Sequence, residues 1–281
     1  MSTESIEKEI RNVSEYIGWV ENLPHKDVTK FYRGQANCGW DITTSVFRGN
    51  LSETYEYDLL EQSSRILWNE LSKYSSCLEK LVFLQHYGLP TRLLDVTLNP
   101  LVALFFACKS NEETNGAVYY GYENGCVKKN EIVAELTAEY KFKHNTNPLC
   151  DDELFVNFVA RKGVQTYEFY TPIFIYPPIN NVRVERQSGA FIMKPLTHDH
   201  RSGTMDTSDE KFEDKNNNSL RNCFMDSVAI IPHECKEDIL RELSMLGIDD
   251  GSMFQTVMDK INAIKEKIGF GPLDSIDFEY I

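Results

Sequence analysis

The chain has 281 residues, of which 42% are hydrophobic and 26% charged, so it can bury a large core in one big domain or two small ones. Its formal net charge of −14 argues against a broad nucleic-acid footprint or an anionic membrane partner, because both need a basic face, although a small basic pocket is compatible with it. The seven cysteines are scattered and lack CxxC spacing, which is typical of free thiols in a reducing compartment. The start is polar and no apolar run approaches the roughly 18 residues of a membrane span, so we expect a soluble, cytoplasmic protein.

Apolar residues recur at helical spacing in the first part of the chain. They predict a helix up to about residue 21, a short strand over 28–33 that turns at Gly34, a long helix that opens at Ser52, and a second helix that ends at Gly88. Further on the pattern takes the period of strands, which we expect at 117–122, 131–136, 171–176, 182–186, 189–194 and 227–231. Because helices come first and strands later, the predicted class is α+β rather than alternating βαβ.

The C-terminal third begins with a charged, asparagine-rich segment at 197–222, which we interpret as a flexible surface insertion. Two helices should follow it, at about 234–246 and 252–269. No internal repeat and no clear linker interrupts the pattern. The predicted organisation is a single domain over 1–281, with a motif-bearing core at 28–108, the insertion at 197–222 and the C-terminal helices at 234–269.

The central stretch, residues 85–108, has two unlike halves. The second half starts at Pro100, is apolar on every side and is preceded by Asn99 as a possible N-cap, which predicts a helix buried all round. The first half should be a loop, and its polar residues are His86, Tyr87, Thr91, Arg92, Asp95 and Thr97. Buried polar groups are costly without partners. A polar loop beside a helix that is apolar on every side therefore indicates a functional site. The alternative is that Arg92 and Asp95 merely pair to hold the loop shut.

Two other clusters could carry chemistry. The sequence Phe-Tyr-Arg-Gly-Gln at 31–35 places Arg33 at a strand end, where a guanidinium can grip a phosphate or carboxylate, and Gly34 would let a ligand approach the backbone. Pairing of that arginine with a local carboxylate is the alternative. The second cluster, at 183–191, lies on two predicted strands bent at a glycine and is otherwise typical of a charged edge strand.

Common enzyme motifs are absent from the sequence, including the GxSxG elbow, HExxH, Walker A and GxGxxG. The sequence His-Asp-His at 198–200 lies in the predicted insertion without a second ligand cluster, so we expect no metal site there.

Taken together, the clusters resemble the FRG domain family of bacterial and phage proteins. The motif at 31–35 is similar to the one that names the family, and Trp40-x-Ile42 with Ser45-x-Phe47-Arg48 is similar to its continuation. QHYGLPTRLLD at 85–95, with Asn-Pro at 99–100 and ALFFA at 103–107, resembles the longest family signature, although Val96 stands where the family usually has tryptophan. Segments at 183–191, 231–232 and 246–248 resemble later family parts, so the resemblance covers almost the whole chain.

The order of parts in this family is similar to that of the ADP-ribosyltransferase superfamily. That resemblance implies N-terminal helices packed on a mostly antiparallel split sheet, with NAD as the substrate. Arg33 would hold the phosphates or ribose of NAD, and the backbone of Gly34 would bond its nicotinamide amide. The implied catalytic residues are Arg33, Arg92, Asp95 and Gln187. The implied NAD-binding residues are Arg33, Gly34, Gln35, His86, Tyr87, Thr91, Thr97, Arg183, Gly189 and Phe191.

The acidic residue of that superfamily has no obvious counterpart here. Transfer of a glycosyl group from NAD develops positive charge on the sugar, which a carboxylate stabilises, but the matching position is the neutral Gln187. Glu185, Asp95 or Glu168 could substitute for it. Every version of this site requires the strand end at Arg33, the central loop and the strand near Gln187 to meet in one cleft.

The preferred hypothesis is an ADP-ribosyltransferase-like enzyme that acts as an intracellular toxin or anti-phage effector on a protein or nucleic-acid target, with a possible regulatory or neutralising partner. The alternative, motivated by Gln187, is a non-catalytic pocket that senses a nucleotide or a phage component and regulates a partner. A weaker alternative is a nuclease that uses Arg33, His86, Asp95 and Gln187 with a divalent metal.

Overall fold

The eight strands of the described part of the chain form one sheet. The computed structural model describes residues 6–50, 53–123, 127–144, 159–160, 162–165, 168–169, 171–176, 186–196 and 220–254. The strand order is β1-β8-β4-β2-β3-β7-β6-β5, and all neighbours are antiparallel except the two outer pairs, β1–β8 and β5–β6. The strands are β1 (Ile6–Glu9), β2 (Lys30–Gln35), β3 (Leu93–Thr97), β4 (Gly116–Tyr122), β5 (Lys128–Lys129), β6 (Ile173–Ile175), β7 (Gly189–Met193) and β8 (Ser227–Ile231). The predicted α+β class with a mostly antiparallel sheet is confirmed.

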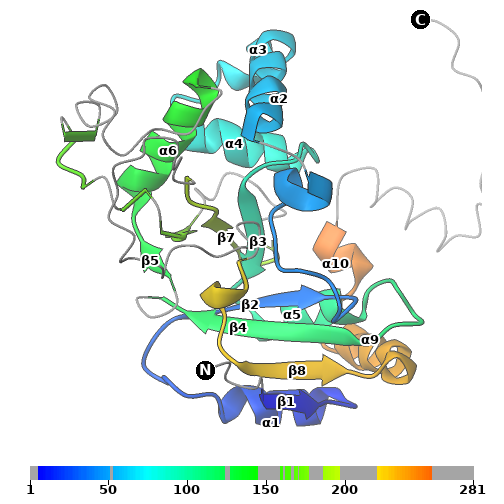
Figure 1. Ribbon diagram of the computed structural model, residues 1–281. Helices are drawn as coiled ribbons and strands as arrows, with labels where there is room; N and C mark the ends of the chain where they lie inside the picture. Colours follow the sequence, from blue (N-terminus) through cyan, green and yellow to red (C-terminus); the bar gives the residue numbers. More distant parts are fainter. Residues whose placement is uncertain are drawn as a thin grey trace, which may run out of the picture.

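The sheet is divided between β2 and β3. Those two strands share a single residue pair, Tyr32 with Thr97, whereas β2 pairs with β4 from Lys30 to Gln35 and β3 pairs with β7 along its whole length. Figure 1 shows the consequence: β2, β4, β8 and β1 lie side by side across the lower part of the molecule, while β3 and β7 run upward from them. The two half-sheets therefore part just beyond the Tyr32–Thr97 pair.

Helices cover the two half-sheets separately. In the upper half, α2, α4 and α6 pack against β3, β6 and β7 around a first apolar core, and in the lower half α1, α5 and α9 pack against β2, β4 and β8 around a second (Figure 1). The helices are α1 (Val13–Glu21), α2 (Glu53–Ile66), α3 (Trp68–Leu71), α4 (Cys77–His86), α5 (Pro100–Cys108), α6 (Glu131–Lys143), α9 (Lys236–Met245) and α10 (Asp250–Phe254), with short 3-10 helices at Ser45–Asn50, Arg221–Cys223 and His233–Cys235. Within the described residues, no helix is long and apolar enough to span a membrane.

One predicted strand is wrong. Residues 131–136 belong to helix α6, although Ile132 and Val133 suggested a strand. The helix starts because the side chain of Asn130 accepts a hydrogen bond from the N–H of Val133, which caps its first turn. Lysines in the last turn complement the negative end of the helix dipole. The cap and the terminal charges outweigh the weak strand propensity of two β-branched residues.

The first predicted helix is also wrong in its first part. Residues 6–9 form the edge strand β1, which pairs with β8 in parallel, and the helix starts only at Val13. Asn12 sets that start by accepting from the N–H of Glu15. The helical spacing of apolar residues extends from β1 into α1 because Ile10 is buried in the same apolar core as the helix.

Other predictions hold with shifted limits. The strand expected at 28–33 runs from Lys30 to Gln35, and the strand at 227–231 is confirmed without change. The expected central loop contains strand β3, and α10 begins at Asp250, two residues before the predicted start. Residues 182–185 of a predicted strand, nearly all of the 197–222 insertion and the last helix beyond residue 254 lie outside the described residues.

Candidate functional site

Helix α5 lies directly on the backbones of β2 and β4. Asn99 caps it by accepting from the N–H of Leu101, and Pro100 occupies its first turn, as the sequence predicted. A Cβ on Gly34 would lie 1.9 Å from the carbonyl oxygen of Ala103, and one on Gly116 would lie 2.2 Å from that of Ala107. The absence of a side chain at Gly34 is therefore required for the packing of α5, and Gly34 also lines a pocket.

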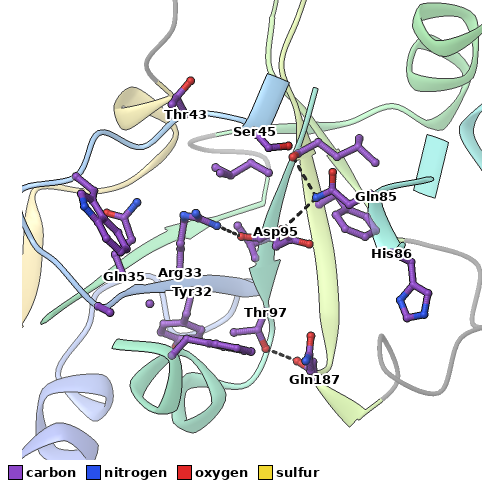
Figure 2. Close-up of a pocket in the computed structure, with 18 of the residues that line it drawn as sticks. Tyr32, Arg33, Gln35, Thr43, Ser45, Gln85, His86, Asp95, Thr97 and Gln187 are labelled. Carbon is purple, nitrogen blue, oxygen red and sulfur yellow. Dashed lines mark hydrogen bonds between the residues drawn. The ribbon is translucent and has the colours of Figure 1, made fainter. Parts of the chain in front are cut away.

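A pocket of about 500 Å³ opens where β2 and β3 part. Its size is within the range of small-molecule sites. Figure 2 shows Arg33 reaching from β2 toward Asp95 on β3, with Gln85 beyond Asp95 and with Thr97 and Gln187 close together. The polar side chains that line the pocket are Arg33, Gln35, Thr43, Ser45, Arg48, Gln85, His86, Asp95, Thr97, Lys109, Ser110 and Gln187.

Arg33 is held in place by a backbone hydrogen bond and forms no ion pair with any residue that the structure describes. Its Nη1 donates to the backbone carbonyl of Asp95 at 2.6 Å, while its Nε is buried with no hydrogen-bond partner among the described residues. Burial lowers the pKa of Arg33 to about 10; the charge of Asp95 opposes this effect and the charge of Arg48 adds to it. The guanidinium is therefore charged at neutral pH and has an unused donor.

Gln35 presents a second unsatisfied group. It lies two residues after Arg33 on β2, so both side chains extend from the same face of the strand (Figure 2). Gln35 is only 4% exposed, and its Oε1 has no partner among the described residues. Buried polar atoms are normally paired, because an unpaired one costs roughly 1–3 kcal/mol. A ligand in this pocket could satisfy both groups.

Two more cations and several aromatic residues surround this pair. Arg48, in the 3-10 helix after β2, and Lys109, at the end of α5, both line the pocket, and Lys109 forms an ion pair with Asp250 of α10. Trp40, which is half exposed, and Phe106 add aromatic surface to the lining. The sequence prediction missed these residues as site members, although the FRG-like segment at 40–48 already contained Trp40 and Arg48.

Asp95 is the one carboxylate among the described residues that line the pocket. It is exposed on β3, between buried neighbours, and its Oδ2 accepts a hydrogen bond from Nε2 of Gln85 at 3.0 Å. Of the other candidates, Glu168 instead bonds Asn130 and the N–H of Gln165 away from the pocket, and Glu185 lies outside the described residues.

Gln187 lies in the turn just before β7, and its side chain lines the same pocket. The hydroxyl of Thr97 donates to the carbonyl of Gln187 at 2.6 Å, and Nε2 of Gln187 donates to the carbonyl of Met253 at 3.0 Å. Phe191 also lines the pocket, and Gly189 pairs with Thr97 across β3 and β7. The three sequence-distant segments therefore meet in one cleft, as expected from the sequence.

Arg92 lies elsewhere. Its side chain is fully buried and forms a two-pronged ion pair with Glu56 of α2, with Nε donating to Oε1 at 2.7 Å. The suggested Arg92–Asp95 pair is therefore wrong, and Arg92 does not line the pocket. We assign it a structural role that joins β3 to α2.

The remaining predicted residues are divided. Thr91 is fully buried behind the pocket, Tyr87 is 72% exposed outside the lining, and His86 lines the pocket at the end of α4. Arg183 lies outside the described residues. Among the described residues, no three His, Cys, Asp or Glu side chains gather closely enough to hold a metal ion.

The fold and the pocket define an α+β protein with a pocket, lined by Arg33, Arg48 and Lys109, at a split in its sheet. Residues 29–116 match the family model of the FRG domain, so this part of the chain is an FRG domain. The match contains Arg33, Arg48, Asp95 and Lys109, whereas Gln187 and the other C-terminal segments lie outside it. No curated protein and no solved structure matches the chain.

Proposed function

We propose that this FRG domain protein binds NAD in the pocket between β2 and β3 and transfers its ADP-ribose group. The observation that carries the proposal is the buried donor on Arg33 and the buried acceptor on Gln35, both without partners among the described residues. A ligand with hydrogen-bond acceptors and donors would satisfy both. NAD offers both kinds of group, as phosphate oxygens and as hydroxyl and amide hydrogens.

Positive charge in the pocket supports a phosphate-bearing ligand. Arg33 keeps its charge at neutral pH, since its pKa of about 10 lies well above 7. Arg48 and Lys109 line the same pocket. A guanidinium binds a phosphate through parallel hydrogen bonds, and partial desolvation strengthens the attraction. Trp40 and Phe106 supply aromatic surface against which a base or nicotinamide ring could pack.

Asp95 is the group best placed to assist the reaction. In the proposed step, the bond between ribose C1′ and the nicotinamide nitrogen breaks, and nicotinamide leaves with the electron pair. A nucleophile of the acceptor forms the new bond to C1′ and gives up its proton. A carboxylate near C1′ stabilises the positive charge that develops on the sugar. Asp95 would take the role that the neutral Gln187 cannot fill.

The test combines binding with product analysis. Isothermal titration with NAD should give a measurable Kd for the wild type, and Arg33→Met should weaken binding at least tenfold. Asp95→Asn should bind NAD within a few-fold of the wild type, yet lower nicotinamide release, followed by mass spectrometry, at least a hundredfold. Arg65→Met removes an exposed arginine that pairs with Glu61 and does not line the pocket, so it should change neither quantity. Absence of binding at millimolar NAD would refute the proposal.

The neutral side chain of Gln187 favours a second candidate, a pocket that senses a nucleotide without altering it. One hydrogen of its amide is already engaged with the carbonyl of Met253, and the side chain has no charge with which to stabilise a developing cation. The same titration separates the two functions. NAD or another nucleotide that binds and raises the melting temperature, but is recovered unchanged after long incubation, would favour the sensor.

A cellular role as an intracellular toxin or anti-phage effector is part of the proposal and follows from the family resemblance alone. Expression of the wild-type chain in bacteria should then slow growth, whereas Asp95→Asn at equal expression should not. Equal growth of the two strains, with and without phage, would refute the toxin or anti-phage role. The proposed NAD reaction would still be tested separately by product analysis.

A further inference from the structure

Gln85, the last but one residue of α4, sits between Asp95 and the interior. Its Nε2 donates to Oδ2 of Asp95 at 3.0 Å and to the backbone carbonyl of Leu93 at 3.2 Å. Both acceptors lie on β3, two residues apart, so one amide group joins the end of the helix to the strand that carries the pocket carboxylate (Figure 2).

Thr91 supports the orientation of the Gln85 amide from the side opposite Leu93 and Asp95. The Oγ1 of Thr91 accepts a hydrogen bond from the N–H of Leu93 at 3.1 Å, so the hydroxyl proton is free to point elsewhere. It points at Oε1 of Gln85, with which Thr91 forms a short hydrogen bond. An amide reversed by a flip would place Oε1 against two acceptors, the Leu93 carbonyl and the Asp95 carboxylate, and would leave the Thr91 hydroxyl without its acceptor. The network therefore turns the NH₂ group of Gln85 toward Asp95.

Ser45 holds Thr91 in turn. Its Oγ accepts from the N–H of Thr91 at 3.0 Å and lies 3.3 Å from the carbonyl of Thr91, to which it can donate. Thr91 itself is fully buried, so its hydroxyl has no access to competing water. The sequence predicts Thr91 as a ligand contact. In the structure it is buried behind the pocket lining, where its hydroxyl bonds the side chain of Gln85, which lines the pocket.

We propose that Gln85, oriented by Thr91, is the positioning residue that holds Asp95 as a hydrogen-bond acceptor facing the pocket. An NH₂ group can only donate, so it engages Asp95 at an oxygen that accepts. Gln85 occupies Oδ2, while no described residue donates to Oδ1. Asp95 thus presents Oδ1 to a ligand in the pocket as a hydrogen-bond acceptor. The catalytic part of this inference rests on the proposed NAD reaction.

Two variants of Thr91 form a matched pair for the test. Thr91→Val keeps the size and removes the hydroxyl, whereas Thr91→Ser keeps it. With NAD, Thr91→Val and Gln85→Leu should lower kcat at least tenfold with less than a threefold change in KM, and Thr91→Ser should stay within threefold of the wild type in both. A merely structural role would not separate kcat from KM in this way. Equal kcat for the valine and serine variants would overturn the inference.

A second measurement does not depend on any reaction. In ¹⁵N-labelled protein, the side-chain NH₂ signals of Gln85 should be shifted and slow to exchange with water. Asp95→Asn and Thr91→Val should both move them toward the values of an exposed glutamine, while Thr91→Ser should leave them in place. If neither Asp95→Asn nor Thr91→Val moves the Gln85 signals, the inference is refuted. If NAD is never consumed but these shifts occur, the proposed reaction fails and the positioning of Asp95 stands.

Discussion

Arg33 and Asp95 are joined through a backbone atom rather than through their charges: Nη1 of Arg33 donates to the carbonyl oxygen of Asp95 at 2.6 Å. The contact crosses the point where β2 and β3 part, so it holds together the two half-sheets at the pocket. The carboxylate of Asp95 instead accepts from Gln85. Within the described part of the chain no carboxylate pairs directly with the arginine, so its charge is available to an anion.

Replacing Arg33 should separate ligand binding from stability. The buried, charged form is disfavoured in the folded protein, as the lowered pKa of about 10 shows. This cost is fully present below about pH 10 and disappears as the pH rises toward the ordinary value of 12.5. At pH 7.5, Arg33→Met removes the cost along with one hydrogen bond, so we expect an unchanged or higher midpoint in urea. Binding of NAD should be lost in the same preparation. A large drop in stability would show that Arg33 is a structural residue.

Arg92 should behave in the opposite way. It is fully buried against Glu56, and Arg92→Met leaves a buried carboxylate with one partner fewer. Breaking a buried ion pair from one side costs about 3–5 kcal/mol, which urea denaturation can measure. Arg241→Met is the control, because Arg241 pairs with Glu237 and Asp238 on the exposed face of α9 and its loss should cost less than about 1 kcal/mol. A stable Arg92→Met protein that fails only in ligand binding would contradict the structural role.

The contrast between the two arginines shows where sequence reasoning about the site stops. Both stand beside short polar motifs, and both qualified as ligand-binding groups. Their difference depends on Glu56, which is 36 residues from Arg92 in the chain and lies on a helix whose approach to β3 no local pattern encodes. Arg33 has no such carboxylate partner among the described residues. This difference between the two arginines can be seen only in the tertiary structure.

For the fold, local signals were sufficient where one physical cause dominated. The buried helix at Pro100–Cys108 followed from its cap, its proline and its uniform apolarity. The sequence pattern predicts a loop where β3 lies, because the polar residues Thr91, Asp95 and Thr97 interrupt the apolar residues of this stretch. Its pairing with β7 depends on residues almost a hundred positions away, so propensity alone could not reveal it.

A methyl group at Gly34 should disrupt the packing of α5. The added Cβ of Gly34→Ala would lie 1.9 Å from the carbonyl oxygen of Ala103 and 2.8 Å from the backbone nitrogen of Ala107, neither of which can move without the helix. We expect a loss of about 3 kcal/mol or more in the free energy of unfolding. Gly18→Ala is the matched control in helix α1, where nothing lies within 4 Å, and it should stabilise by about 0.5–1 kcal/mol. Equal effects of the two substitutions would mean that α5 does not rest on β2.

The ion pair between Lys109 and Asp250 should limit how strongly the pocket attracts anions. Asp250→Asn keeps the size of the side chain and releases Lys109 to the pocket that it lines. We expect the affinity for NAD, and for pyrophosphate as a simpler probe, to rise severalfold at low salt, with a steeper fall as salt is added. Asp238→Asn makes the same charge change on α9 beside Arg241, away from the pocket lining, and should alter neither. Equal gains from both substitutions would reduce the effect to overall charge.

Cysteine reactivity tests whether α5 is as deeply buried as the pocket requires. Burial raises the pKa of the Cys108 thiol to about 12, so almost no reactive thiolate is present at pH 8. Cys38, by contrast, is exposed in the loop after β2. Brief treatment with iodoacetamide at pH 8, followed by peptide mapping, should modify Cys38 and spare Cys108, and prior denaturation should make the two react alike. Rapid modification of Cys108 in the folded protein would show that α5 opens to solvent. It would also mean that α5 does not stay packed against β2, the strand that carries Arg33 and Gly34.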